Sequence, residues 1–178
     1  PQAATGYNLE AELAARFKKP DASLQALARA YQIAPSSDTA ATYHLALLRA
    51  GKSGQAEQVA QQWLKQHTND SVFRMYLAGL YLQKQQTAQA IAEYQQIVKT
   101  TPNHVMALNH LAALLEEQND PAAFGYAQRA YGLQPANPVV MDTYGWSLLQ
   151  QGKIQEAAPL LKQAAQAMPE APSVQYHW

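Results

Sequence analysis

The sequence predicts an all-α fold of helical hairpins joined in tandem, and three observations support this prediction. Apolar residues recur at the spacing of a helix face rather than in alternation, most clearly in segments 71–81 and 90–98. Short breaks of glycine or polar residues separate these segments in pairs. Prolines follow several of the pairs at a nearly constant interval, so the chain of 178 residues consists of a series of similar units.

The interval between the marker prolines gives the length of the unit. Pro102, Pro135 and Pro169 follow one another at a nearly equal spacing, and Pro35 precedes them by twice that spacing, with Thr68 halfway across the long gap. The period of about 33 to 34 residues is shared by two classes of helical repeat. The chain has no TPLH-like turn, and each unit holds two full helical patterns, which argues against ankyrin repeats.

Several positions repeat when the chain is aligned on this period. The first helix carries a large–small pair: Leu45-Ala46, Leu77-Ala78, Leu111-Ala112 and Tyr144-Gly145. The second helix carries a small residue at Ala56, Ala90, Ala123 and Ala157, and the position seven residues later reads Trp63, Ile97, Ala130 and Ala164. Small residues at such positions let two helices approach to about 8 to 10 Å. This pattern resembles the tetratricopeptide repeat (TPR), and the resemblance implies a right-handed superhelix of stacked hairpins, an α-solenoid.

The expected organisation is a single TPR array. Its repeats are 5–35 (divergent), 38–68, 71–102, 105–135 and 138–169, followed by 172–178 as the start of a truncated further repeat. The chain begins at proline and stops abruptly, so we expect it to be a fragment of a longer protein. Helix caps are predicted at Asp21, Asp70, Thr87 and Asp120.

The composition excludes several classes of function. Thirteen basic residues balance thirteen acidic residues, so no overall charge favours nucleic acid or an anionic membrane. No apolar run approaches the length of about eighteen residues that suggests a membrane-spanning helix. The chain has no cysteine, so a disulfide framework and thiolate chemistry are excluded.

Motifs that could carry chemistry have simpler explanations. Gly51-Lys52-Ser53 resembles the end of a phosphate-binding loop, but it lacks the preceding glycine and strand and fits an inter-helix turn. Asn69-Asp70-Ser71 matches a glycosylation sequon but is better explained as a helix cap. The adjacent Glu116 and Glu117 point about 100° apart on a helix, which suits a solvated helix end better than acid–base catalysis.

The histidines do not form a recognisable metal motif. The five are His44, His67, His104, His110 and His177, and none belongs to an HExxH pattern. A metal site would need ligands from separate repeats, and we expect His44 and His110 to lie at the edge of a groove instead. The sequence therefore predicts no enzyme activity, no cofactor and no metal.

The resemblance implies a binding groove on the first helices. In TPR proteins, positions two before and two after the first residue of the large–small pair point into the concave face. Carried over to this chain, the first set is Tyr43, Met75, Asn109 and Asp142, and the second set is Leu47, Gly79, Ala113 and Trp146.

The chemistry of these eight residues points to an apolar groove. The chaperone-tail clamp of some TPR domains uses lysine, arginine and asparagine here, whereas this chain offers only Asn109. Aromatic and aliphatic residues flanked by Glu116, Glu117 and Asp142 favour a hydrophobic partner segment that can also carry basic residues. In the alternative interpretation, the large side chains merely pack between neighbouring first helices.

The leading functional interpretation is a non-enzymatic scaffold that binds a partner peptide or domain. The YHLA-type helix start, the linkers with proline and the Ala/Gln-rich helices are similar to long bacterial TPR proteins. These include the TPR lipoprotein of the PEP-CTERM/exosortase system and export scaffolds for exopolysaccharide. That resemblance implies a periplasmic or outer-membrane-tethered location, with a cytoplasmic one as the alternative.

Two other classes of function remain open. One is a helical accessory domain of a larger enzyme such as a glycosyltransferase. The other is self-association through exposed ends of the solenoid, for which Tyr176 and Trp178 are candidates.

Overall fold

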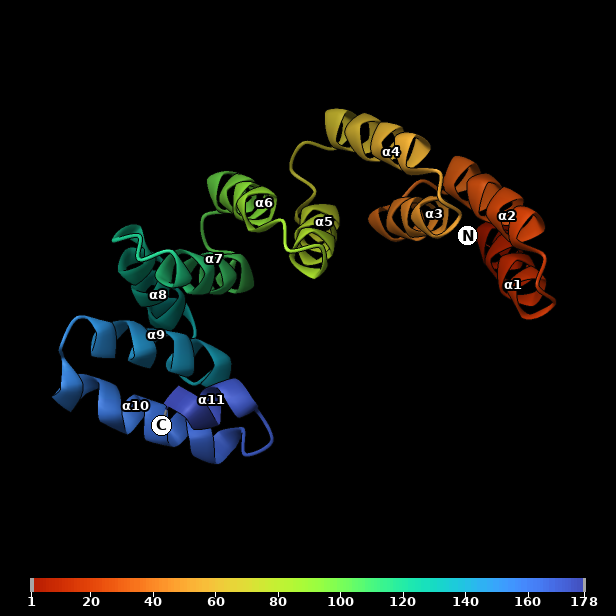
Figure 1. The fold of residues 1–178 in the computed structure, drawn as a ribbon. Coiled ribbons are helices and arrows are strands. Elements are labelled where there is room, and N and C mark those ends of the chain that lie inside the picture. Colours follow the sequence, from red (N-terminus) through yellow and green to blue (C-terminus); the bar gives the residue numbers. More distant parts are fainter. Residues whose placement is uncertain (1, 178) are drawn as a thin grey trace. The chain divides into compact units, whose positions relative to one another are not determined.

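The computed structural model describes residues 2–177, and these residues form eleven helices without any strand (Figure 1). The helices are α1 (Gln2–Arg16), α2 (Pro20–Ile33), α3 (Ser37–Arg49), α4 (Ser53–Gln66), α5 (Ser71–Gln83), α6 (Thr87–Thr100), α7 (Val105–Glu117), α8 (Ala122–Leu133), α9 (Pro138–Gln150), α10 (Ile154–Ala167) and α11 (Pro172–His177). The predicted all-α fold is therefore confirmed. Within the described part of the chain, no helix combines the length and apolar character needed to cross a membrane.

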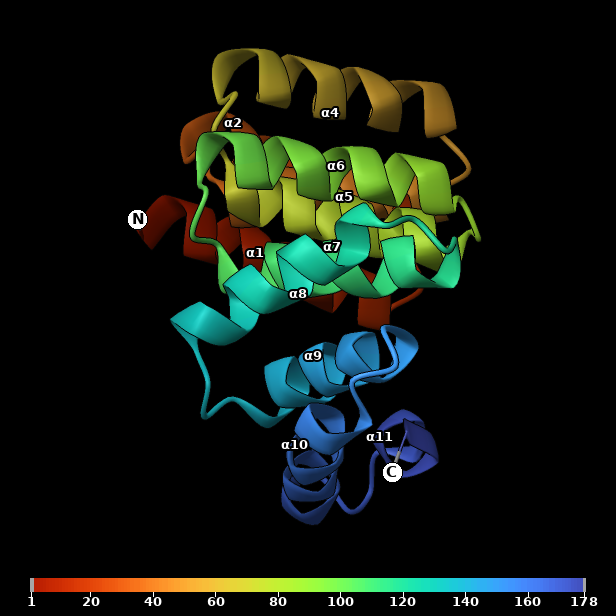
Figure 2. The ribbon, with the colours of Figure 1, turned by 90° about the vertical axis from the view of Figure 1, so that its left-hand side faces the viewer.

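The chain divides into two compact units, residues 1–76 and 77–178, and each is described by itself. In the first unit, α1 packs on α2, α2 on α3, and α3 on α4. In the second, α7 packs on α8, α8 on α9, and α9 on α10, while α9 also contacts α7 and α11 (Figure 2). The expected division of the chain into one array of repeats stays a prediction.

Small residues allow the helices of each hairpin to approach closely. Ala56, Ala90, Ala123 and Ala157 of the second helices are all buried, as the repeated alanine pattern leads us to expect. One close approach is at Gly145 of α9. A Cβ atom at Gly145 would lie only 2.9 Å from Cδ2 of Leu161 on α10, so these two helices leave no room for a methyl group.

A left-handed residue ends the first helix of every hairpin. These residues are Lys18, Gly51, Gln85, Asn119 and Gly152, with φ between 54° and 73°. Their spacing is nearly constant, so the backbone repeats with the same period as the prolines. Only two of the five are glycines, although glycine adopts this conformation most easily. The turn geometry is therefore more regular than the sequence that forms it.

Two of the four predicted cap residues accept a backbone hydrogen bond at the start of a helix, and the other two, Asp21 and Thr87, lie within the first turns of α2 and α6 instead. A carboxylate oxygen of Asp70 accepts a hydrogen bond of 3.0 Å from the backbone N–H of Phe73, and Asp120 accepts one of 2.8 Å from Ala122. Thr87 is the first residue of α6 rather than its cap, and the residue in the cap position makes no side-chain hydrogen bond. The turn before α6 is instead set by the left-handed Gln85.

Candidate functional site

The positions of the left-handed turn residues correct the alignment of the first helices. The interval from Gly51 to Gln85 is longer by two positions than the interval from Leu45 to Leu77. The true counterpart of Leu77 is therefore Tyr43, two residues earlier than the sequence pattern suggests. The repeats from 71 onward keep the expected alignment.

This shift explains why one predicted groove residue, Leu47, is not accessible. Leu47 is completely buried and packs with Leu24 of α2 and Ala56 of α4, so it is a core residue that no partner can reach. Tyr43 is half-buried and stacks on Tyr31, with their ring centroids 5.8 Å apart. In the corrected alignment, the groove positions of this repeat are held by Ala41 and Leu45.

The other predicted residues differ in how accessible they are. Met75 and Gly79 of α5 are partly exposed, and no described atom lies within 4 Å of a Cβ placed at Gly79. Asn109 and Asp142 are only 3% and 7% exposed, so little of either side chain is accessible, and their role in a groove stays a prediction. The amide oxygen of Asn109 has no hydrogen-bond donor among the described residues, an expensive arrangement for a buried polar atom.

Two of the predicted residues, Ala113 and Trp146, share a cavity of about 350 Å³ in the second unit. Its walls come from α7, α9 and α11 and from the turn after α7. The lining residues are Ala113, Glu116, Glu117, Asn119, Thr143, Trp146, Ser147, Gln150 and His177. These residues define the Trp146 cavity.

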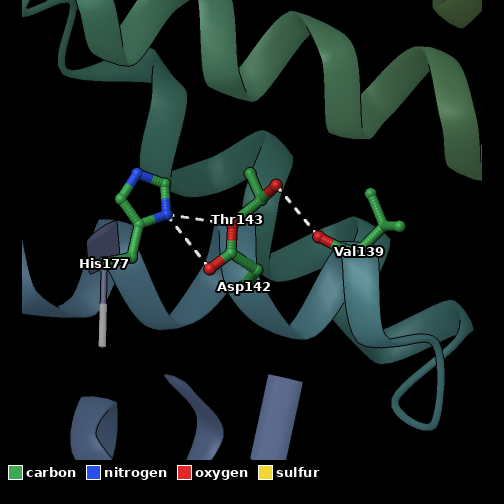
Figure 3. Close-up of polar contacts among 4 residues, drawn as sticks. All are labelled: Val139, Asp142, Thr143 and His177. Atoms are coloured by element: carbon green, nitrogen blue, oxygen red, sulfur yellow. Dashed lines mark hydrogen bonds and ion pairs between the residues drawn. The ribbon is translucent and has the colours of Figure 1, made fainter. Parts of the chain in front are cut away.

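The imidazole of His177 forms one edge of the Trp146 cavity. Its Nδ1 atom lies 2.9 and 3.0 Å from the two carboxylate oxygens of Asp142 (Figure 3). The same ring stacks on the indole of Trp146, with centroids 4.3 Å apart and planes within 20°. Burial raises the pKa of Asp142, while the charge and hydrogen bond of His177 act in the opposite direction.

A second polar contact joins two residues of the cavity lining. The buried hydroxyl of Ser147 on α9 donates a hydrogen bond of 2.7 Å to a carboxylate oxygen of Glu116 on α7. This contact joins two first helices that are one repeat apart in the chain. It also holds the Glu116 carboxylate at the cavity wall, while the neighbouring Glu117 stays exposed.

Sequence reasoning missed the roles of His177 and Ser147. His177 belongs to the short tail that the sequence identifies as the start of a further first helix, but its contact with Asp142 depends on how that helix packs. Ser147 follows Trp146 directly and lies 31 residues from Glu116. A search for polar pairs about one repeat apart on first helices would have found both contacts.

The two histidines expected at the groove edge both contact an aromatic ring. His44 is buried, and its Nδ1 lies 2.7 Å from the hydroxyl of Tyr76, whose pKa burial raises to about 12 against the opposing effect of Arg49. His110 stacks on Tyr94 at 5.2 Å, and its pKa is lowered by burial and by the nearby His104. His44 is therefore part of the packed interior, whereas the position of the half-buried His110 at the groove edge stays a prediction.

No metal centre can be assembled from the residues that the structure describes. Within 2–177, no group of three or more histidine, aspartate or glutamate side chains could hold an ion. Gly51-Lys52-Ser53 lies at the turn between α3 and α4, with Gly51 at φ 71°.

Another cavity, of about 330 Å³, lies in the first unit among α1, α2 and α3. Leu45 lines it, and Leu45 occupies the same repeat position as Trp146 in the corrected alignment. Its charged lining residues are Lys18 and Arg49, whereas those of the Trp146 cavity are glutamates. The same position in two repeats therefore faces opposite charge.

Comparisons with known proteins identify the repeats. Residues 47–115 match the family model for the tetratricopeptide repeat. A TPR repeat-containing protein of Pseudomonas aeruginosa is 29% identical over 129 residues, which are 70% of this chain and 22% of that protein. The matched segment thus spans about a fifth of the curated relative.

Solved structures show the same fold. A tetratricopeptide repeat protein from Parabacteroides merdae matches 99% of this chain and 71% of its own, with a TM-score of 0.71 and 15% identity. A crystal structure of MamA matches 88% of this chain and 92% of its own, with a TM-score of 0.64 and 13% identity. The chain therefore has the fold of a TPR solenoid, and residues 47–115 carry TPR repeats.

Proposed function

We propose that this chain is a non-enzymatic protein-interaction scaffold whose Trp146 cavity receives a partner peptide or a segment of a partner domain. TPR folds in general support protein–protein interaction, because stacked hairpins present an extended surface of first helices. The observation that carries the proposal is the half-buried Trp146 at the wall of an open cavity.

Trp146 combines the properties of a binding anchor. Its indole rests against the buried cluster of Leu148, Ala157 and Leu161, which fixes its orientation. One side of the residue still lines the cavity, where a partner could bury it further. Tryptophan residues in such pockets are frequent interface hot spots, and truncation of one often costs about 2 kcal/mol or more.

The test compares capture of partners by the wild-type chain and by Trp146→Leu. Leucine keeps apolar packing on the cluster but removes the aromatic wall, so we expect partner affinity to fall at least about tenfold while melting changes little. Tyr126→Leu on α8 is the matched control, because Tyr126 does not line the cavity. Equal capture by wild type, Trp146→Leu and Tyr126→Leu would contradict the proposal.

We also propose that the scaffold works in the bacterial envelope, in protein sorting or exopolysaccharide assembly. The support is the similarity of the helix starts and linkers to the TPR lipoprotein of the PEP-CTERM/exosortase system. The corresponding location is the periplasm or the outer membrane, with the cytoplasm as the alternative. Fractionation of cells that produce the full-length tagged protein tests this, and recovery only in the cytoplasmic fraction would contradict it.

Self-association is a second candidate function, and a specific surface favours it. Leu9, Leu13 and Phe17 follow one face of α1 and the turn after it, with 62%, 57% and 68% of their surfaces exposed. A second copy of the chain could cover this stripe. Tyr176 at the other end is 81% exposed, while Trp178 lies outside the described residues.

A further inference from the structure

We infer that the Trp146 cavity selects an arginine side chain of the partner segment. The inference rests on the proposed function, because it names the chemistry that the same cavity would recognise. The guanidinium would lie against the part of Trp146 that lines the cavity and pair with the carboxylates of Glu116 and Glu117.

The first argument is charge. Glu116 and Glu117 both line the cavity, and no lysine or arginine is found among the described residues of its lining. Neither carboxylate forms an ion pair within residues 2–177. The chain as a whole carries equal numbers of acidic and basic residues, so this local excess of negative charge does not follow from its composition. A cationic partner group is complementary to it.

The second argument is preorganisation. The hydrogen bond from Ser147 holds the Glu116 carboxylate in place, and Ser147 itself is 2% exposed. The acceptor therefore does not have to be ordered when a partner binds, which reduces the entropic cost of association. Glu117 is exposed and free to move toward a bound cation.

The third argument comes from the chain's own His177. Its flat ring lies parallel to the Trp146 indole and reaches a carboxylate, Asp142, with Nδ1. This is the combination of stacking and carboxylate pairing by which a planar guanidinium binds. The site thus already holds one flat basic group at its edge, and the remaining space borders two further carboxylates.

The size of the cavity fits one side chain. Its volume of about 350 Å³ is near the lower end for ligand pockets, which run from about 300 to 1,000 Å³. Arginine is favoured over lysine because its planar fork can donate hydrogen bonds to two carboxylates at the same time. The glutamine and asparagine side chains of the lining, Gln150 and Asn119, offer further oxygen acceptors for its N–H groups.

The test uses two synthetic nonapeptides of alanine and leucine, acetylated and amidated, that differ only at the central residue. One carries arginine and the other carries citrulline, which has nearly the same shape but no charge. Each is titrated into the full chain, and the indole N–H resonance of Trp146 is followed by NMR. We expect the arginine peptide to bind about tenfold more tightly, and the difference to shrink in high salt.

Glu117→Gln is the decisive variant, since it removes one charge without disturbing the Ser147 contact. It should abolish most of the preference for arginine. Glu156→Gln on α10 is the matched control, because Glu156 is exposed and does not line the cavity. Thermal melting of both variants shows whether they fold like the wild type.

The inference is overturned if the two peptides bind equally, if neither perturbs Trp146, or if the preference survives Glu117→Gln. In each case the scaffold proposal stands as long as captured partners are lost in Trp146→Leu. Conversely, the arginine peptide could bind more tightly while partner capture is unchanged in Trp146→Leu. That result would overturn the scaffold proposal alone.

Discussion

Asp70 shows how one side chain joins three helices of the first unit. One carboxylate oxygen of Asp70 caps α5 by accepting a hydrogen bond from the backbone N–H of Phe73. The other oxygen accepts hydrogen bonds of 2.7 Å from the hydroxyl of Ser37 and from the indole N–H of Trp63. Burial alone would raise the pKa of Asp70, but these hydrogen bonds lower it below 3.8. The charged form is therefore the one that the fold stabilises.

The Asp70→Asn variant should lose about 1–2 kcal/mol of unfolding free energy at pH 7, because a hydrogen-bonded charge is removed at a partly exposed site. Since the pKa is lowered in the folded state, this contribution is complete above pH 3.8 and disappears as the pH falls through the folded-state value. Urea unfolding at several pH values measures it. Asp38→Asn is the control, and an equal loss in both variants, or one that persists at low pH, would contradict the assignment.

Individual groove residues were only partly predictable from the sequence. Ala113 and Trp146 do line a cavity, because both of their repeats are aligned correctly. Leu47 does not, because the Leu45-Ala46 pair imitates the expected motif two residues out of register. Asn109 and Asp142 hold groove positions but are buried, and Asp142 is covered by a contact with His177 from α11, the next first helix. Such coverage depends on packing between repeats, which a single-repeat motif does not describe.

At the scale of the helices, the sequence was a better guide. Apolar periodicity and proline spacing predicted paired helices throughout, because each hairpin must bury one face of each helix against its neighbours. The remaining uncertainty was the register of each first helix. That register is set by the left-handed turn residue, and the turn leaves little trace in the sequence where it is Lys18 or Gln85 rather than glycine.

The contact between α9 and α10 gives a prediction at this scale. Gly145→Ala must displace the buried side chain of Leu161, a cost of about 1–3 kcal/mol that exceeds the gain in helix propensity of about 1 kcal/mol. We expect a net loss of up to about 2 kcal/mol in thermal or urea unfolding. Gly125→Ala on α8 has no described atom within 4 Å of the new Cβ and should instead gain about 0.5–1 kcal/mol. A stabilised Gly145→Ala would show that this crossing tolerates a wider separation.

At the scale of the whole molecule, the exposed apolar stripe on α1 leads to a prediction about the oligomeric state of the chain. Sedimentation of the wild-type chain should depend on concentration, because association would bury the apolar stripe of Leu9, Leu13 and Phe17. The double variant Leu9→Gln/Leu13→Gln should stay monomeric, whereas Ile154→Gln, which removes a single exposed apolar residue elsewhere, should behave like the wild type. A wild-type chain that is strictly monomeric at high concentration would rule out this mode of association.

The five left-handed turn residues also bear on how a protein of this kind can change in length. Each turn presents the same backbone conformation, one repeat after the turn before it. Removing or duplicating the segment between two such turns would join equivalent backbone ends and leave both neighbouring hairpins intact. Inserting a single residue before a turn would instead rotate the preceding helix by about 100° relative to the turn. The apolar face of that helix would then point away from the core. Growth or loss by whole repeats is therefore structurally inexpensive, whereas a change of one residue is not.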